Sequence, residues 1–174
     1  MFFGRLLKEK GIREFISVAK KVNQLKLDCE FQIVGNFDKN NPSSISENEI
    51  KEFKKYKNNK FADFKSDVRD VIKWSNCVVL PSYREGTPRG LLEALSIGRP
   101  IITTNAIGCR EVIKHGKNGF KIKIKDANSL FLAIKLFHKQ SKKKKIEMSK
   151  YSRKFVSKKF SEDRVIKIYE KLLV

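Results

Sequence analysis

The amino-acid sequence predicts an α/β fold, a Rossmann-like doubly wound parallel sheet with helices on both faces. Short apolar runs alternate with segments of helical periodicity along most of the chain. The run Cys77–Leu80 lacks polar alternation, as expected for a parallel strand buried on both faces. The chain has 174 residues, of which 40% are hydrophobic, and this suffices for the buried core of one domain.

The first part of the chain is predicted to supply three strands. Phe2-Phe3 has the character of a strand end and stops at Gly4, and residues 30–34 form a strand that stops at Gly35. A third, short strand is expected over residues 61–64. Together they would form one half of the sheet.

Three helices are predicted among these strands. Apolar residues at helical spacing indicate a helix over residues 13–25. Ser46 and Glu49 have the spacing of a capping box, which predicts a helix that continues to about Tyr56. Asp67 is expected to cap the third helix, whose apolar residues are Val68, Val71, Ile72 and Trp74.

The second part of the chain continues the alternation. The strand Cys77–Leu80 is closed by Pro81-Ser82, and a helix over residues 88–96 ends at Gly98. The remaining predicted elements are strands over 100–104 and 120–124, a helix marked by Leu130, Ile134 and Phe137, and the C-terminal helices of 142–174. Residues 1–174 are therefore interpreted as a single domain.

The charge is strongly positive. The chain has 39 Lys and Arg against 19 Asp and Glu, a net charge of +20. Nine of the basic residues are arginine, and apart from Lys142–Lys145 the cations are spread over predicted helix faces. A solvated surface explains this pattern. Contact with an anionic membrane or another polyanion is the alternative.

The cysteines and histidines indicate a cellular compartment and do not indicate a metal site. Cys29, Cys77 and Cys109 are an odd number without metal-binding spacing, and only two histidines are present. The longest apolar runs are too short to span a bilayer. We therefore expect a protein of the reducing cytoplasm, with peripheral contact to the inner face of the membrane as an option.

Three predicted loops carry residues suited to ligand binding. They span residues 4–11, 84–93 and 105–111, and each follows the end of a predicted strand. In an open α/β sheet, ligands bind beyond the carboxyl ends of the strands. We therefore expect these loops to build one site.

The second loop is the most informative. Glu85 precedes the helix, and Glu93 follows eight residues later, a spacing of about two helical turns. The free backbone N–H groups of Arg89 and Gly90 at the helix start suit an anion such as a diphosphate. The two carboxylates would then bind hydroxyl groups of a sugar and of a ribose. Stabilisation of the helix by both carboxylates is the alternative, and Arg5 and Lys10 taken singly are ordinary surface charges.

Taken together, these motifs resemble the C-terminal, donor-binding domain of family 4 glycosyltransferases, enzymes of the GT-B fold. Residues 4–12 are similar to the family's G-R-L-x-x-E-K-G, and residues 79–86 to its L-P-S-x-x-E-G. Glu85 and Glu93 match its E-x7-E pair. Further similar segments are Ile33-Val34-Gly35, residues 108–113, residues 115–120, Phe160-Ser161 and residues 169–173.

The resemblance implies roles for individual residues. Arg5 and Lys10 would neutralise the diphosphate of a nucleotide-sugar and stabilise it as the leaving group. Glu85 would hold the transferred sugar and Glu93 the ribose. The catalytic set is thus Arg5, Lys10 and Glu85, and the donor-binding set is Gly4, Arg5, Lys10, Glu85, Gly86, Thr87, Arg89, Gly90 and Glu93. The family retains the anomeric configuration and generally needs no metal or other cofactor.

One departure from the family pattern concerns Pro88. Many relatives have a glycine near this position, and proline offers no N–H, so one phosphate contact must move to a neighbour. The Thr-Pro-Arg version resembles enzymes that build bacterial surface polysaccharides from UDP-sugars. This implies transfer of a hexose-type sugar to a polysaccharide or lipid-linked oligosaccharide.

The N-terminal, acceptor-binding domain of the family has no counterpart here, and the first strand looks truncated. The resemblance therefore implies a missing domain or a separate subunit as partner, and inactivity of this chain alone. Two alternatives stay open. One is a non-enzymatic basic module that binds anionic lipid or nucleic acid, although no specific nucleic-acid signature supports it. The other is a decayed gene fragment.

Overall fold

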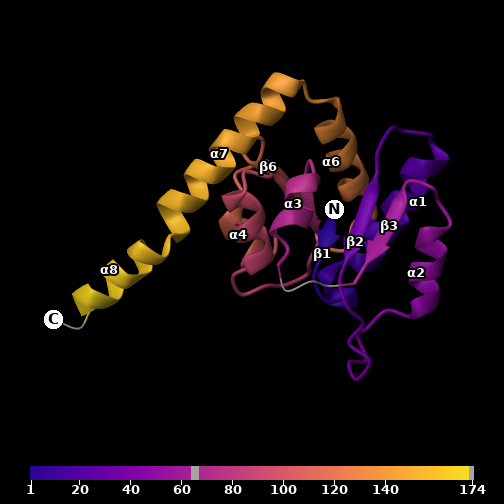
Figure 1. Cartoon of the computed structure of the whole chain (residues 1–174), viewed down its shortest axis with the longest axis horizontal. Coiled ribbons are helices and arrows are strands. Elements are labelled where there is room, and N and C mark those ends of the chain that lie inside the picture. Colours follow the sequence, from indigo (N-terminus) through magenta and orange to yellow (C-terminus); the bar gives the residue numbers. More distant parts are fainter. Residues whose placement is uncertain (64–66, 173–174) are drawn as a thin grey trace.

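A computed structural model describes residues 1–63 and 67–172 of the chain. Three residues of the predicted elements, Phe64, Leu173 and Val174, lie outside the described residues. Figure 1 shows a sheet flanked by helices, with the last helix extending away from the rest of the fold.

The sheet has two parallel three-stranded parts that meet edge to edge. One part has the order β1-β2-β3 and the other β4-β5-β6. The N–H of Val79 donates to the carbonyl of Met1 at 2.8 Å, and the amino group of Met1 donates to the carbonyl of Cys77 at 2.9 Å. The strands thus follow the order 3-2-1-4-5-6, which confirms the doubly wound prediction. Their bounds are β1 Phe2–Phe3, β2 Phe31–Val34, β3 Asn59–Ala62, β4 Val78–Leu80, β5 Ile101–Thr104 and β6 Gly119–Ile122.

Helices cover both faces of the sheet. Helix α1 packs against α2 and α6, whereas α4 packs against α7 (Figure 1). Because each crossover between neighbouring parallel strands is right-handed, reversing the strand order moves the helices to the other face. Their bounds are α1 Ile12–Gln24, α2 Glu47–Lys54, α3 Arg69–Trp74, α4 Arg89–Ser96, α5 Cys109–Val112, α6 Ala127–Lys139, α7 Lys142–Phe160 and α8 Glu162–Leu172, with a 3₁₀ turn, η1, at Lys8–Lys10.

Phe15 shows how the predicted periodicity becomes a core. It lies on the apolar stripe of α1 and is fully buried. Its ring contacts Phe2 of β1, Phe31 of β2 and Phe53 of α2, at centroid distances of 5.8, 5.5 and 6.4 Å. Burying a phenylalanine side chain stabilises a fold by about 2–3 kcal/mol. The cluster joins one layer of helices to the sheet.

The structure corrects several predicted details. Strand β3 begins two residues before the predicted start, at Asn59. Helix α3 has Val68 as its N-cap, and Asp67 instead accepts a hydrogen bond from the N–H of Arg69. Trp74 is 87% exposed rather than part of the core. The one-turn helix α5 was not predicted, because four residues are too short to show a helical period.

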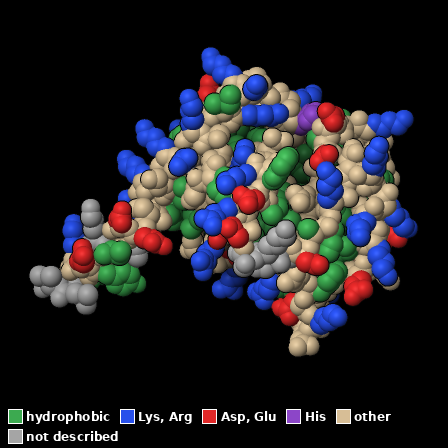
Figure 2. Space-filling view, in the orientation of Figure 1, with side chains coloured by type: hydrophobic (Ala, Val, Ile, Leu, Met, Phe, Trp, Pro, Cys, Tyr) green, Lys and Arg blue, Asp and Glu red, His purple; other side chains and the backbone are tan. Residues whose placement is uncertain are grey.

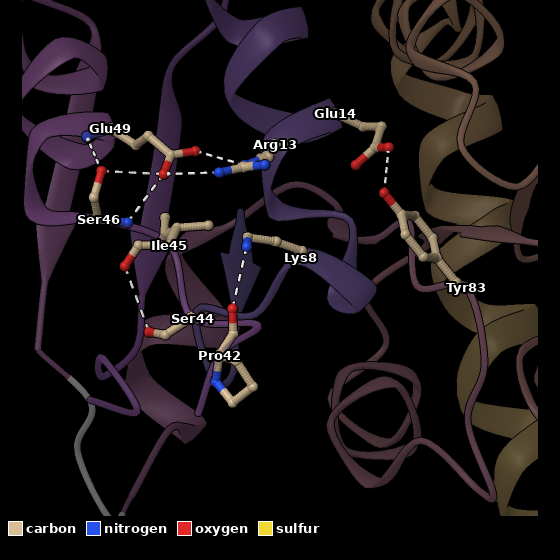
Figure 3. Close-up of polar contacts among 9 residues, drawn as sticks. All are labelled: Lys8, Arg13, Glu14, Pro42, Ser44, Ile45, Ser46, Glu49 and Tyr83. Carbon is tan, nitrogen blue, oxygen red and sulfur yellow. Dashed lines mark hydrogen bonds and ion pairs between the residues drawn. The ribbon is translucent and has the colours of Figure 1, made fainter. Parts of the chain in front are cut away.

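The capping box at the start of α2 is present as predicted, and it is linked to α1. Ser46 and Glu49 bond reciprocally, and the guanidinium of Arg13 donates to both carboxylate oxygens of Glu49, at 2.7 and 3.2 Å (Figure 3). The hydrogen bonds from Arg13 lower the pKa of Glu49 below its ordinary value of 4.5. This carboxylate therefore contributes stability that is full above pH 4.5 and is lost as the pH falls below it.

We predict that Arg13→Ala lowers the free energy of unfolding by about 0.5 kcal/mol at pH 7, because the pair is largely exposed. The difference from the wild type should shrink as the pH falls from 5 to 3, since Glu49 becomes protonated in both proteins. Urea unfolding at a series of pH values measures this. Lys20→Ala, at an exposed position of the same helix, is the control. A pH-independent difference would contradict the assignment.

Candidate functional site

The three loops identified in the sequence meet at the carboxyl ends of the strands. The N–H of Tyr83, directly before the second loop, donates to the carbonyl of Glu9 at 2.8 Å, which ties the start of the second loop to the first loop. The N–H of Glu85 donates to the carbonyl of Ile107 at 3.2 Å, which joins it to the third. Since β1 and β4 are neighbours at which the strand order reverses, the loops surround the topological switch point of the sheet.

Lys10 and Glu85 form the charged centre of this arrangement. The Nζ atom of Lys10 lies 2.7 Å from Oε1 and 2.8 Å from Oε2 of Glu85. The two side chains are only 21% and 11% exposed, so water screens the pair less than it does an ordinary surface ion pair. The structure therefore brings together two of the three predicted catalytic residues.

Two glycines allow the loops to approach each other closely. Gly11 has φ of +73°, and a Cβ atom there would lie 2.2 Å from the carbonyl oxygen of Pro81. Gly108 has φ of +78°, and its Cβ would lie 2.1 Å from the carbonyl oxygen of Gly86. Only glycine accommodates both the left-handed backbone and the contact. These two positions therefore define how near the first and third loops come to the second.

The start of α4 presents backbone donors beside the ion pair. Pro88 is the N-cap, and its carbonyl accepts hydrogen bonds from the N–H groups of Leu91 and Leu92. The N–H groups of Arg89 and Gly90, in the first turn, come before the first hydrogen bonds within the helix. Such N–H groups at a helix start suit an anion. Glu93 follows one turn later and is half-buried. Thr87 and Gly86 are exposed in the loop.

A third glycine, Gly90, allows a close contact between α4 and β1. A Cβ atom at Gly90 would lie 2.8 Å from the ring of Phe3. Glycine at this position lets the start of the helix lie against the end of β1. The predicted phosphate-binding turn is thus held near the loop that carries Lys10.

Arg5 lies apart from the ion pair. It is exposed, and its Nη1 atom lies 3.3 Å from Oδ2 of Asp38, in the loop after β2. Gly4, before it, has φ of +137°, a conformation that side chains rarely adopt. Asp38 is a partner that sequence reasoning missed, because no local pattern connects residues 33 positions apart.

Tyr83 is the other side chain that the sequence analysis missed. Its hydroxyl donates to Oε1 of Glu14 at 2.6 Å, which ties the second loop to α1 (Figure 3). Burial and the neighbouring carboxylate raise the pKa of Tyr83 well above its ordinary value. The other carboxylate oxygen of Glu14, Oε2, is buried and has no hydrogen-bond partner among the described residues. Tyr83 therefore binds this carboxylate through Oε1. Tyr83 thereby holds the loop that carries Glu85.

Two of the three cysteines are buried. Burial raises the pKa of Cys77 to about 12 and also raises that of Cys109, which keeps both thiols protonated and unreactive. Within residues 1–63 and 67–172, no group of three or more His, Cys, Asp or Glu side chains is placed to hold a metal ion.

A hollow of about 790 Å³ lies at the opposite end of the strands, lined by residues that include Cys29, Phe31, Cys77 and His138. None of the described residues that line it belongs to the three loops. We therefore assign the candidate site by its convergent polar groups and its place in the sheet rather than by cavity size.

Comparison with known proteins shows what the chain as a whole is similar to. The family model described as "Glycosyl transferases group 1" matches residues 1–155. An N,N'-diacetylbacillosaminyl-diphospho-undecaprenol alpha-1,3-N-acetylgalactosaminyltransferase of Campylobacter jejuni is 32% identical over 142 residues, 82% of this chain and 36% of that protein. A UDP-Gal:alpha-D-GlcNAc-diphosphoundecaprenol alpha-1,3-galactosyltransferase of Escherichia coli is 32% identical over 75% of this chain and 34% of its own length.

Solved structures show the same fold. Anabaena HepE in complex with UDP superposes with a TM-score of 0.82 at 21% identity, over 98% of this chain and 47% of that one. TarM superposes with a TM-score of 0.82 at 20% identity, over 98% of this chain and 34% of that one. The chain thus spans about a third of the curated relatives and at most half of these structures.

Proposed function

This chain belongs to the glycosyl transferases group 1 family, and we propose that it binds the nucleotide-sugar donor, a UDP-sugar, of a glycosyltransferase. Its fold is that of the C-terminal Rossmann-like half of GT-B enzymes. The observation that carries the proposal is the site itself. A lysine paired with a carboxylate and the N-terminus of a helix converge at the switch point of the sheet.

The proposed chemistry is stabilisation of a leaving group. When the bond between the sugar and the diphosphate breaks, negative charge grows on the diphosphate. Lys10 and Arg5 would neutralise that charge, and the N–H groups of Arg89 and Gly90 would donate to its oxygens. Lys10 is held by its ion pair with Glu85 before the reaction and would stabilise this charge without reorganising, whereas Arg5 would have to leave Asp38. We propose Arg5, Lys10 and Glu85 as the catalytic set.

Carboxylates would orient the remainder of the donor. Glu93 would accept hydrogen bonds from the ribose hydroxyls, and Glu85 from hydroxyls of a hexose-type sugar. The Lys10–Glu85 ion pair orients both groups before the donor arrives and stays compatible with binding, because each carboxylate oxygen can accept more than one hydrogen bond. We further propose that transfer retains the anomeric configuration.

The acceptor side belongs to the proposal as well. The Campylobacter and Escherichia relatives are named for acceptors carried on diphosphoundecaprenol, and a Staphylococcus aureus relative, 29% identical over 92% of this chain, is named for capsular polysaccharide biosynthesis. We propose a polysaccharide or lipid-linked oligosaccharide acceptor, held by an N-terminal domain or separate subunit. Because donor and acceptor must be positioned together, this chain alone should not transfer sugar. We place the reaction in the cytoplasm.

Calorimetric titration with UDP tests donor binding. We expect saturable binding that is insensitive to EDTA, and Glu93→Gln should weaken it about tenfold, or about 1.4 kcal/mol, through weaker ribose contacts. Glu47→Gln, at an exposed position in the first turn of α2, is the control and should bind as the wild type does. Absence of binding at millimolar UDP, or equal effects of the two changes, would contradict the proposal.

A further inference from the structure

A second feature of the surface lies where α7 meets α8. Tyr151, Lys154, Phe155, Lys158, Lys159 and Arg164 line a shallow hollow of about 390 Å³, which we call the α7 patch. Two aromatic rings form its apolar part, stacked at a centroid distance of 6.1 Å. Four cations surround them. An apolar base with a cationic rim suits a ligand that combines an anionic group with an apolar body.

The patch belongs to a helix of exceptional charge. Helix α7 contains nine Lys and Arg residues and a single acidic residue, Glu147. Blue side chains project along its outer side in Figure 2, away from the α4 contact. The helix is buried there through Met148, Ser152 and Val156, so exposed cations such as Lys150 and Lys154 lie on the solvent side. The solvent side of the helix is therefore lined by cations, while Lys145 and Lys159 bond to carbonyl groups of the neighbouring elements.

A lysine lies over each ring of the patch, so a nucleic-acid base would have to displace a cation to stack there. The Nζ atom of Lys117 lies 5.9 Å from the Tyr151 ring centroid, and that of Lys159 lies 5.8 Å from the Phe155 centroid. Sequence-tolerant binding of single strands depends on free aromatic faces. Cations over the rings instead favour anionic head groups that need charge and a partly apolar surface.

The patch lies at the same end of the sheet as the donor loops. The Nζ atom of Lys159 donates to the carbonyl of Glu111 at 3.4 Å, and Glu111 lies in α5 at the end of the third loop. Arg164 donates to the carbonyl of Lys158 at 3.2 Å, which holds the start of α8 against the end of α7. A surface that docks here would lie close to the end of the molecule that carries Lys10 and Glu85.

We propose that the α7 patch docks the chain on an anionic phospholipid bilayer, with one lipid phosphate seated among its cations. Each Lys or Arg held near such a surface contributes favourable binding energy that fades within a Debye length. The aromatic rings would lie at head-group depth, where amphipathic rings are favoured. No helix of the described residues is long and apolar enough to cross a membrane, so this contact is peripheral. The proposal does not depend on the donor chemistry.

Sedimentation with vesicles tests it. The full chain is mixed with vesicles of phosphatidylcholine containing 30% phosphatidylglycerol, or of phosphatidylcholine alone. Lys154→Glu/Lys158→Glu should reduce partition into the anionic vesicles at least tenfold. Lys51→Glu/Lys54→Glu, exposed on α2 at the other side of the molecule (Figure 1), changes net charge equally and should reduce it less than threefold.

Three outcomes would overturn the proposal. Equal losses in the two double variants would assign binding to net charge rather than to the patch. Equal binding to both kinds of vesicle would exclude recognition of anionic lipid. Tighter binding of fluorescent polyuridine than of anionic vesicles at the same salt concentration would assign the patch to nucleic acid. UDP binding, measured by calorimetry, should be unchanged in the patch variants. A failure of the membrane proposal is therefore distinguishable from a failure of the donor-site assignment.

Discussion

Lys10→Ala is expected to weaken UDP binding by about 30-fold, or about 2 kcal/mol, because it removes a cation from the proposed diphosphate site. The same change leaves the carboxylate of Glu85, only 11% exposed, without its counter-ion. We therefore also expect the free energy of unfolding to fall by about 2 kcal/mol, less than for a fully buried pair. Calorimetry with UDP and urea unfolding measure the two effects.

A second variant separates binding from stability. Lys10→Met/Glu85→Gln replaces both charges with neutral groups of similar size, so the stability lost in Lys10→Ala should largely return. UDP binding should stay weak. Lys8→Ala, which removes a neighbouring cation bonded to the Pro42 carbonyl at 3.1 Å (Figure 3), is the control and should bind UDP like the wild type. If the double variant bound UDP normally, Lys10 would have only a structural role.

Gly11→Ala is the change expected to damage the fold most. Alanine there must adopt φ of +73° and place Cβ 2.2 Å from the Pro81 carbonyl oxygen, which no side-chain rotation relieves. We expect a loss of more than about 3 kcal/mol from strain and displaced backbone, together with loss of UDP binding. Thermal and urea unfolding with calorimetry measure it.

Gly116→Ala provides the matched control for that prediction. Gly116 has φ of +74°, almost that of Gly11, but a Cβ atom there meets nothing within 4 Å. Its substitution should cost only about 1–2 kcal/mol, the penalty for a left-handed backbone. If both variants lost equal stability, the contact between the first and second loops would not be needed for the fold.

The presence and order of most secondary-structure elements followed from local patterns. The apolar stripe of α1, the capping box at Ser46 and Glu49 and the unbroken apolar run of β4 are each encoded within a few neighbouring residues. Element ends were less predictable. Strand β3 starts at Asn59 rather than at 61, since strand ends depend on the pairing partner, here β2.

The exposure of individual side chains could also not always be predicted from local sequence patterns. Trp74 is an apolar residue on a short helix, and the sequence assigned it to the helix's apolar set. In the structure its side chain is 87% exposed, because α3 is only six residues long and buries Ile72 and not Trp74. Which face of so short a helix is covered depends on its neighbours.

The sequence by itself determined the alternation of strands and helices, the family resemblance and the residues placed after the strand ends. Only the tertiary structure decided which of those residues touch. Lys10 meets Glu85 across 75 positions of sequence, whereas Arg5 meets Asp38 and Tyr83 meets Glu14. The physical reason is that strand order and the close approaches at Gly11 and Gly108 bring distant loops together, and local periodicity carries no information about such approaches.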